Sequence, residues 1–597
     1  MKNNRPYKKS GQKRVCLGIT VLLYLMNSTL QAQYINGSDT STLDRTPLPK
    51  TEGSVLPELS KLPELPPITE DKNKLSSLSQ IKVKQFQFEG NTVFSDEELA
   101  EITKPYEDEN RELSPEQLQD VKNDITGHYI KNGYVNSGAI IPDQKITDGI
   151  VIIKIIEGVL VQVEASGNKR LRTDYIENRL KYQDTEALDL EELQDRLQML
   201  QQNPLFERIQ AELGPGVKLG EGILKIHVDE APPRELQFTF NNHRSPSVGA
   251  YRGQIEGWYR NLTGIFGTKS GFGDTFYLRY GLTEGLNDFT VKYDFPLNRY
   301  DSTVSLHVER SDSEVVEAPF NQLDVESEAD TYALTFSQPL YQEPEGYFNL
   351  SLRLEKRTSK TFLLGQPFSF SPGVKDGVSE LSVIRFSQDW LKRNPVQVLA
   401  ARASFNFGVD ALDSTINDDG SPDSEFFSLL GQFQYVRRLN FFKSKRWNLS
   451  QMIFRTDFQL ANQDLLPLEK LSIGGASTVR GYRENVLTRD NGMISSFELR
   501  LPLLHLPISD ATKSFEEGWL ELATFVDYGR AWNADSDTPE PKDIYSAGLG
   551  FIWNPNKYFH GEIYWGHALQ TDDIPDPDEQ NLQDDGVHFE MSVNYPF

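Results

Sequence analysis

The residues best placed to do chemistry in this chain lie in a glycine-rich stretch, residues 471–482. Its two adjacent glycines, Gly474 and Gly475, can take positive φ, so the backbone can turn sharply there. The stretch ends in Val479, Arg480, Gly481 and Tyr482. This pattern suits a loop that folds back on itself and holds one fixed cation, Arg480, at its tip. Taken alone, the same residues also fit an ordinary surface hairpin loop.

Motifs of the common enzyme classes are missing from the sequence. The eight histidines are scattered, and there is no His-Glu-x-x-His, Gly-x-Ser-x-Gly or Walker motif. Two acidic segments, 417–420 and 572–579, could attract calcium, but Thr415 and Phe426 stand where a calcium loop would carry acids. Solvated extracellular loops explain these segments better. We therefore expect no enzymatic activity, no catalytic residue, no metal site and no cofactor.

Charge and cysteine content narrow the class of protein further. The net charge is −26, and removing the six positive charges of residues 1–32 from it leaves about −32. Such an acidic chain is unsuited to nucleic acid, which requires a basic surface. The one cysteine is Cys16. Without residues 1–32 the protein has no cysteine and so no disulfide, and it must be held together by its core or its sheet.

The first 79 residues read as a targeting segment and a spacer. Residues 1–32 combine a basic start, an apolar run from Val15 to Leu30 and a small residue, Ala32, at a plausible cleavage point, which predicts a signal peptide. An uncleaved anchor is the alternative, although the apolar run is short for a spanning helix. Residues 33–79 contain many prolines and predict an extended periplasmic linker, with a Pro-rich ligand for a partner domain as the alternative.

Residues 80–158 and 159–232 predict two repeated α+β domains. A strand ending in Gly90-Asn91 is echoed by a strand ending in Gly167-Asn168, and each turn precedes a capped helix, a longer amphipathic helix and two strands. In the first domain we expect helices that begin at Ser95 and Ser114, and strands at 135–141 and 151–156. In the second domain we expect helices that begin at Thr173 and Asp189, and strands at 206–213 and 223–228. A three-stranded sheet has open edges that an extended peptide can join. Simple spacer domains are the alternative.

Residues 233–597 read as one antiparallel β-barrel. Strand after strand alternates apolar and polar residues, as in Phe276, Leu278 and Tyr280, with Tyr277 and Arg279 between them. Lipid-facing and lumen-facing strands require this pattern, although a soluble sandwich gives a similar one. At about 20–25 residues per strand with its connection, the 363 residues from 235 to 597 predict about 16 strands. The last strand favours the barrel, because its apolar face ends in the terminal residue, Phe597.

The order of these parts resembles a two-partner secretion translocator of the outer membrane, a family related to barrel-assembly insertases. The resemblance covers nearly the whole chain after the signal peptide. It implies that the two repeated units are polypeptide-transport-associated (POTRA) domains in the periplasm and that residues 479–482 tip a loop folded into the barrel lumen. It also implies that the arginine pairs with the acid of a Phe-x-Asp-x-Gly pattern, which Phe525–Gly529 matches. Some families of this architecture plug the pore with an N-terminal helix, which the prolines of residues 33–79 make doubtful here.

Strand parity supports the implied pairing. If Leu522, Thr524 and Val526 face lipid, Asp527 faces the lumen. By the same alternation Glu498 also points inward, opposite Phe497 and Leu499. A carboxylate and a guanidinium form a bidentate pair that could pin the loop. A lumenal Asp527 that faces only water is the alternative.

These expectations define a translocator that exports one large, β-rich secreted protein. Its other partners would be outer-membrane lipid and, during biogenesis, the barrel assembly machinery, with no nucleic acid. The first alternative is an insertase that assembles other barrels, for which more POTRA units would be expected. The second is a passive diffusion porin, which would need no periplasmic domains.

Overall fold

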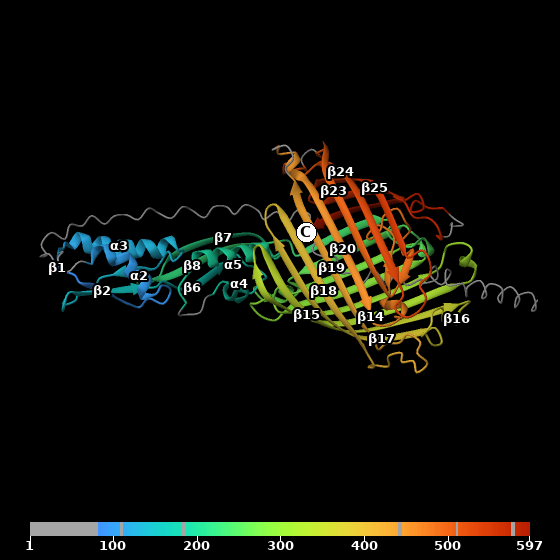
Figure 1. Cartoon of the computed structure of the whole chain (residues 1–597), viewed down its shortest axis with the longest axis horizontal. Helices are drawn as coiled ribbons and strands as arrows, with labels where there is room; N and C mark the ends of the chain where they lie inside the picture. Colours follow the sequence, from blue (N-terminus) through green and yellow to red (C-terminus); the bar gives the residue numbers. More distant parts are fainter. Residues whose placement is uncertain (1–80, 108–111, 182–185, 440–443, 509–510, 575–579) are drawn as a thin grey trace, which may run out of the picture. The chain divides into compact units, whose positions relative to one another are not determined.

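The computed structural model describes residues 81–597 except 108–111, 182–185, 440–443, 509–510 and 575–579 (Figure 1). The predicted signal peptide and Pro-rich linker lie outside the described residues. The described residues divide into two compact units: one lies within residues 81–232 and 260–273, and the other lies within residues 233–259 and 274–597. None of the described helices combines the length and the apolar content that a membrane crossing requires.

The smaller unit begins with a three-stranded sheet and two helices. These elements are β2 (Gln85–Glu89), α2 (Asp96–Thr103), α3 (Pro115–Lys131), β4 (Gly138–Ile140) and β5 (Ile150–Ile156), preceded by β1 (Ile81–Lys82), which pairs with β3 (Glu112–Leu113). The sheet order is β2-β5-β4, with β2 parallel to β5 and β4 antiparallel to it. Both helices start at a capping box, at Ser95 and Ser114. Apolar side chains of α3, such as Val121 and Ile125, are fully buried in the core against the sheet.

The same order of elements follows once more. The second set is β6 (Val159–Ser166), α4 (Thr173–Leu180), α5 (Leu190–Gln202), β7 (Phe206–Pro215) and β8 (Glu221–Glu230). Its sheet order is β6-β8-β7, and a separate apolar core, with Ile176 and Leu193 among its members, lies under it. Asp189 caps α5 by accepting from the backbone N–H of Glu191 (2.8 Å). Thr173 is the first residue of α4 and not its cap, which is Arg172 without a side-chain capping bond. The Thr173 hydroxyl accepts from the Asn168 amide (3.1 Å).

Each repeat closes its Gly-Asn turn with a carboxylate at the end of the sheet. In the first, Glu157 accepts from the backbone N–H groups of Thr92 (2.7 Å) and Val93 (2.8 Å) and from the Tyr129 hydroxyl (2.9 Å). In the second, Glu230 accepts from three successive backbone N–H groups, at Lys169 (2.8 Å), Arg170 (2.9 Å) and Leu171 (2.9 Å). The two domains therefore share the hydrogen bonds that close this turn as well as the order of their elements. The sequence analysis did not predict these carboxylates.

The larger unit is a closed antiparallel barrel, and the prediction of about 16 strands is confirmed. The described residues form sixteen long strands and the two-residue β16 (Gln366–Pro367), which pairs only with the end of β15. The long strands are β9 (Arg234–Asn241), β10 (Arg252–Arg260), β11 (Thr275–Leu282), β12 (Leu286–Pro296), β13 (Thr303–Glu314), β14 (Val325–Glu343), β15 (Gly346–Leu363), β17 (Val378–Arg393), β18 (Gln397–Val409), β19 (Phe427–Leu439), β20 (Ser450–Ala461), β23 (Asn491–His505), β24 (Trp519–Trp532), β25 (Asp543–Asn556), β26 (Phe559–Ala568) and β27 (Val587–Pro596).

Antiparallel pairing of β27 with β9 closes the barrel. Phe597 extends this seam, because its backbone N–H donates to the carbonyl of Arg234 (2.9 Å) and its carbonyl accepts from the Arg234 N–H (3.2 Å). The outward face of β27 is apolar, with Met591, Val593 and Tyr595 exposed. Closure leaves no free barrel edge among the described strands, which satisfies the backbone polar groups within a membrane.

Alternation along each strand separates an outer from an inner face. On β24, Val526 is 56% exposed, whereas Asp527 is fully buried. On β23, Phe497 is 45% exposed, whereas Glu498 is buried. The carboxylates named from strand parity therefore lie on the inner face.

We expect the turn-closing carboxylate to stabilise the first repeat in a pH-dependent way. Burial raises the pKa of Glu157, but hydrogen bonds from Thr92, Val93 and Tyr129 outweigh burial, and the pKa is lowered overall. A lowered pKa in the folded state gives stability that is present above the unfolded pKa of about 4.3 and is lost as the pH falls through the folded value. Glu157→Gln should cost about 1–3 kcal/mol at pH 7 and less at pH 3.

The measurement is the urea concentration at which a protease begins to cleave within residues 81–158 of the full chain. The matched control is Glu97→Gln, which changes an exposed carboxylate of α2. An equal loss for both variants at pH 7, or a loss from Glu157→Gln that does not shrink on acidification, would contradict the assignment.

Candidate functional site in the barrel lumen

The glycine-rich stretch belongs to a long connection between β20 and β23, residues 462–490, which we call the lumenal loop. Within it, β21 (Leu471–Ile473) pairs antiparallel with β22 (Leu487–Arg489) to form a short hairpin. Gly474 and Gly475 both take positive φ, +117° and +100°. Such φ values favour glycine, and a Cβ atom on Gly474 would also lie 2.6 Å from the backbone carbonyl oxygen of Arg483. The sharp turn expected at these two glycines is present.

The structure places Arg480 directly against Asp527 of β24. Arg480 Nε donates to Asp527 Oδ2 (2.8 Å) and Arg480 Nη2 donates to Asp527 Oδ1 (2.9 Å), which is a bidentate ion pair. The backbone N–H of Arg480 also donates to Oδ2 (3.0 Å), and the Ser496 hydroxyl donates to Oδ1 (2.6 Å). Asp527 thus holds both the side chain and the main chain of the loop.

Glu498 of β23 binds the remaining end of the same guanidinium. Arg480 Nη1 donates to Glu498 Oε2. The other carboxylate oxygen accepts from Arg500 Nε (2.5 Å) and from the Tyr564 hydroxyl (3.1 Å). Two arginines therefore face two carboxylates, so the cluster is balanced in charge, and each of the four residues is at most 7% exposed. Such balance is what buried charges require.

Two aromatic rings enclose the Arg480 guanidinium. Its central carbon lies 3.7 Å from the Phe525 ring centroid and 4.7 Å from the Tyr564 centroid, and the two rings meet edge to face at 5.8 Å. The negative faces of aromatic rings attract a cation. Phe525 and Asp527 share one face of β24 because they are two residues apart.

Glycines of the barrel wall let the loop approach closely. A Cβ atom on Gly481 would lie 2.9 Å from the carbonyl oxygen of Gly566 on β26, so this contact is between two backbones. Val479 is fully buried, and a Cβ atom on Gly529 of β24 would lie 2.9 Å from its side chain. The glycine that ends the Phe-x-Asp-x-Gly pattern therefore leaves room for the residue that precedes Arg480.

Tyr482 reaches the next pair of strands. Its hydroxyl donates to the carbonyl of Tyr545 on β25 or to that of Gln570, both at 2.9 Å. The Tyr482 carbonyl lies 3.1 Å from Nε2 of His588 on β27, and the His588 ring is buried. All four residues of the 479–482 motif therefore contact the inner wall of the barrel, and Tyr482 also contacts the connection that follows β26.

Sequence reasoning missed several further contacts. Arg483 binds the carboxylates of Asp584 (Nη2 to Oδ2, 2.8 Å) and Glu317 (Nη1 to Oε1, 2.6 Å), both in connections between strands. The contacts of Ser496 and Tyr564 with the two carboxylates were also missed. The only sequence signal for them is the alternation of inward and outward residues along β23 and β26. Phe597 lies at the β27–β9 seam.

The chemistry that this arrangement supports is electrostatic attachment of a loop. The two carboxylates of the site, Asp527 and Glu498, form ion pairs with arginines. Within the described part of the chain no group of three or more His, Cys, Asp or Glu side chains is placed to hold a metal ion. Removing one partner of a buried ion pair costs about 3–5 kcal/mol, since the other charge stays buried.

Comparison with known proteins agrees with this architecture. Residues 220–552 match the family model for the haemolysin secretion/activation protein ShlB/FhaC/HecB, and residues 81–158 match the model for a ShlB-type POTRA domain. The outer membrane transporter CdiB of Dickeya dadantii is 20% identical over 485 residues, with 78% of this chain and 79% of that protein covered. The heme/hemopexin transporter protein HuxB of Haemophilus influenzae is 22% identical over 445 residues, with 72% of each covered.

A solved structure shows the same fold. CdiB from Escherichia coli superimposes with a TM-score of 0.65 at 20% identity, over 88% of this chain and 93% of that one. Since the family match at residues 220–552 spans more than half of the 597 residues, this protein belongs to the ShlB/FhaC/HecB family of haemolysin secretion/activation proteins, outer-membrane transporters with a POTRA domain and a β-barrel.

Proposed function

We propose that this protein recognises one large, β-rich secreted protein through two periplasmic POTRA domains, residues 80–158 and 159–232, and exports it through the barrel of residues 233–597. The observation that carries the proposal is the lumenal loop, which a buried ion pair holds against inward-facing residues of a closed barrel. In this proposal Arg480, Asp527 and Glu498 keep the loop in the lumen, and no catalytic step is involved.

The open sheet edges support the binding step. Among the described strands, β7 pairs only with β8. On its other edge the Gln201 side chain of α5 accepts from the Ile209 N–H (2.8 Å) and donates to the Glu207 carbonyl (3.3 Å), which leaves the backbone groups after Ile209 for another strand. An extended chain can add to such an edge through main-chain hydrogen bonds. The sequence has no Walker motif, so folding of the exported protein outside the cell is the proposed driving force.

The proposal is preferred over two alternatives. A passive porin needs neither periplasmic domains nor a loop held by buried charges. An insertase for other barrels would be expected to carry more repeats than the two that precede this barrel. A cross-linking experiment separates these readings by the identity of the bound protein.

The ion pair should be essential for export. Arg480→Ala and Asp527→Ala should each reduce secretion of the partner at least roughly tenfold. The first leaves the buried Asp527 carboxylate without its guanidinium, and the second leaves Arg480 and Arg500 to share the Glu498 carboxylate, so either variant has an uncompensated buried charge at a cost of several kcal/mol. Arg480→Lys should be impaired as well, because an ammonium group cannot make the bidentate contact. The measurement is the amount of partner in the culture medium, normalised to folded barrel in the outer membrane.

The matched control is Arg310→Ala, which removes an exposed arginine from the pair that it forms with Asp312 on β13. This variant should secrete normally. Wild-type export from both Arg480→Ala and Asp527→Ala would eliminate the proposed role of the contact.

The edge of β7 should contact the exported chain. A photo-cross-linking residue at Gln210, which is exposed on β7, should capture one large secreted protein in cells that produce the full chain. The same residue at Glu191, exposed on α5, should capture far less. Capture of many barrel precursors at Gln210 would instead support the insertase, and no capture at all would argue for spacer domains.

A further inference from the structure

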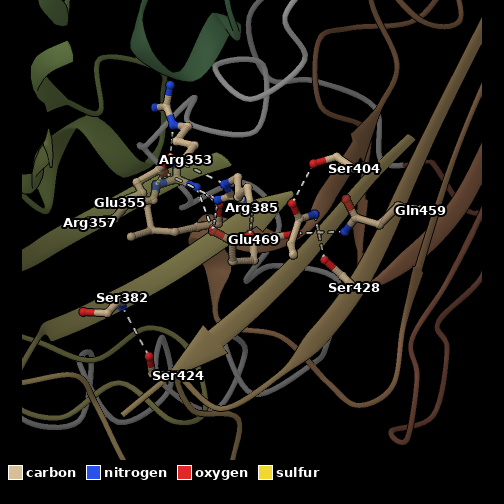
Figure 2. Close-up of polar contacts among 12 residues, drawn as sticks. Arg353, Glu355, Arg357, Ser382, Arg385, Ser404, Ser424, Ser428, Gln459 and Glu469 are labelled. Carbon is tan, nitrogen blue, oxygen red and sulfur yellow. Dashed lines mark hydrogen bonds and ion pairs between the residues drawn. The ribbon is translucent and has the colours of Figure 1, made fainter. Parts of the chain in front are cut away.

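A second cluster of buried charges joins the lumenal loop to the barrel wall. Glu469 lies in the first leg of the loop, eleven residues before Arg480. Its carboxylate accepts from Arg385 of β17 (Nη2 to Oε1, 2.7 Å; Nη1 to Oε2, 3.1 Å) and from Arg357 of β15 (Nη1 to Oε1, 2.9 Å). Figure 2 shows Glu469 beside Arg385, with Arg357 and Glu355 on the neighbouring strand.

Arginines outnumber carboxylates in the wall contacts of this cluster. Arg353 and Arg385 stand directly opposite each other on β15 and β17, and like charges in that position are destabilising. Arg353, Arg357 and Arg385 contribute three positive charges, whereas the wall carboxylate that contacts all three is Glu355. Arg357 is 2% exposed and Arg385 is 7% exposed. Glu469 therefore adds a second carboxylate, which binds both of these buried arginines directly.

Apolar packing fixes the same leg of the loop beside the charges. Leu465, Leu466 and Leu468 are buried against Leu381 and Val383. Leu381, Val383 and Arg385 alternate along β17 and so share its inner face. Arg357 Nη1 also donates to the carbonyl of Leu468 (2.8 Å). The first leg thus rests on a surface of β17 that is apolar at one end and cationic at the other.

The two charged clusters occupy separate parts of the wall. The Arg480 cluster is built on β23 and β24, and the Glu469 cluster on β15 and β17, with β18, β19 and β20 between them. No residue is shared between the two sets of contacts described above. Between the anchors, the amide of Gln459 on β20 donates to the carbonyls of Glu469 (2.8 Å) and Asp490 (3.0 Å), which joins the two legs of the loop.

We propose that Glu469 is a second, independent anchor of the lumenal loop, a positioning residue that holds its first leg to β15 and β17 while Arg480 holds its tip to β23 and β24. The inference rests on the proposed function of the loop in transport, but it concerns the resting protein. Freeing the tip alone then leaves the first leg in place, and a complete release of the loop requires both clusters to open.

Hydrogen–deuterium exchange of the purified full-length protein in detergent tests this proposal without any exported partner. Glu469→Gln keeps the shape of the side chain and removes its charge. We expect amide exchange in residues 465–473 to become roughly tenfold faster or more, because two buried arginines lose a carboxylate. Exchange in residues 478–484 should stay close to that of the wild type, and Arg480→Ala should give the reverse pattern.

The matched control is Asp389→Asn, which breaks an ion pair with Arg402 between two wall strands, β17 and β18, without touching the loop. It should leave exchange in both segments unchanged. If Glu469→Gln fails to fold, Arg385→Gln removes the partner from the wall side and should accelerate exchange in residues 465–473 in the same direction.

Unchanged protection of residues 465–473 in a folded Glu469→Gln or Arg385→Gln protein would overturn the anchor. Acceleration of both segments by Arg480→Ala alone would overturn its independence. Because no partner is present, either failure is distinct from a failure of the proposed transport function, which the secretion measurements test.

Discussion

The position of the tip of the lumenal loop depends on one buried guanidinium. Arg480 contacts two carboxylates, a hydroxyl and two aromatic rings. The N–H donors of its guanidinium are therefore hydrogen-bonded, and the planar group lies against the rings. A charge in such a place is stable only while those partners are present. Moving the tip away would therefore leave the Asp527 carboxylate without its guanidinium and the Glu498 carboxylate with Arg500 as its cation. This requirement makes the resting position of the tip specific.

The barrel supplies the geometry that this contact needs. Closure through β27 and β9 turns alternate residues of every strand inward, which places carboxylates, aromatic rings and glycines around one interior. Gly566 is needed as well as the charges, since a side chain there would collide with the backbone of Gly481. Charge and shape thus act together: the ion pair gives the loop a partner, and the small residues give it space.

Much of the architecture could be predicted from the sequence because its signals are local. The alternation on β23 and β24 was enough to turn Glu498 and Asp527 inward, and the Gly-Asn turns were enough to identify a repeat. The carboxylates Glu157 and Glu230 that close those turns were missed, since each lies more than 55 residues from the amides that it binds. Glu469 was missed for a similar reason, because Arg357 lies 112 residues before it and no motif links the two.

The sequence by itself determined the order of the parts, the face that each strand residue takes and the chemical type of the loop tip. These are properties of neighbouring residues, set by a two-residue strand period and by the turning freedom of glycine. The family resemblance implied the pairing of Arg480 with Asp527. The tertiary structure alone decided the other contacts among inward-facing groups, because barrel closure brings strands from distant parts of the chain around one lumen. Two separated clusters of buried charge, at Arg480 and at Glu469, exist only once that closure has occurred.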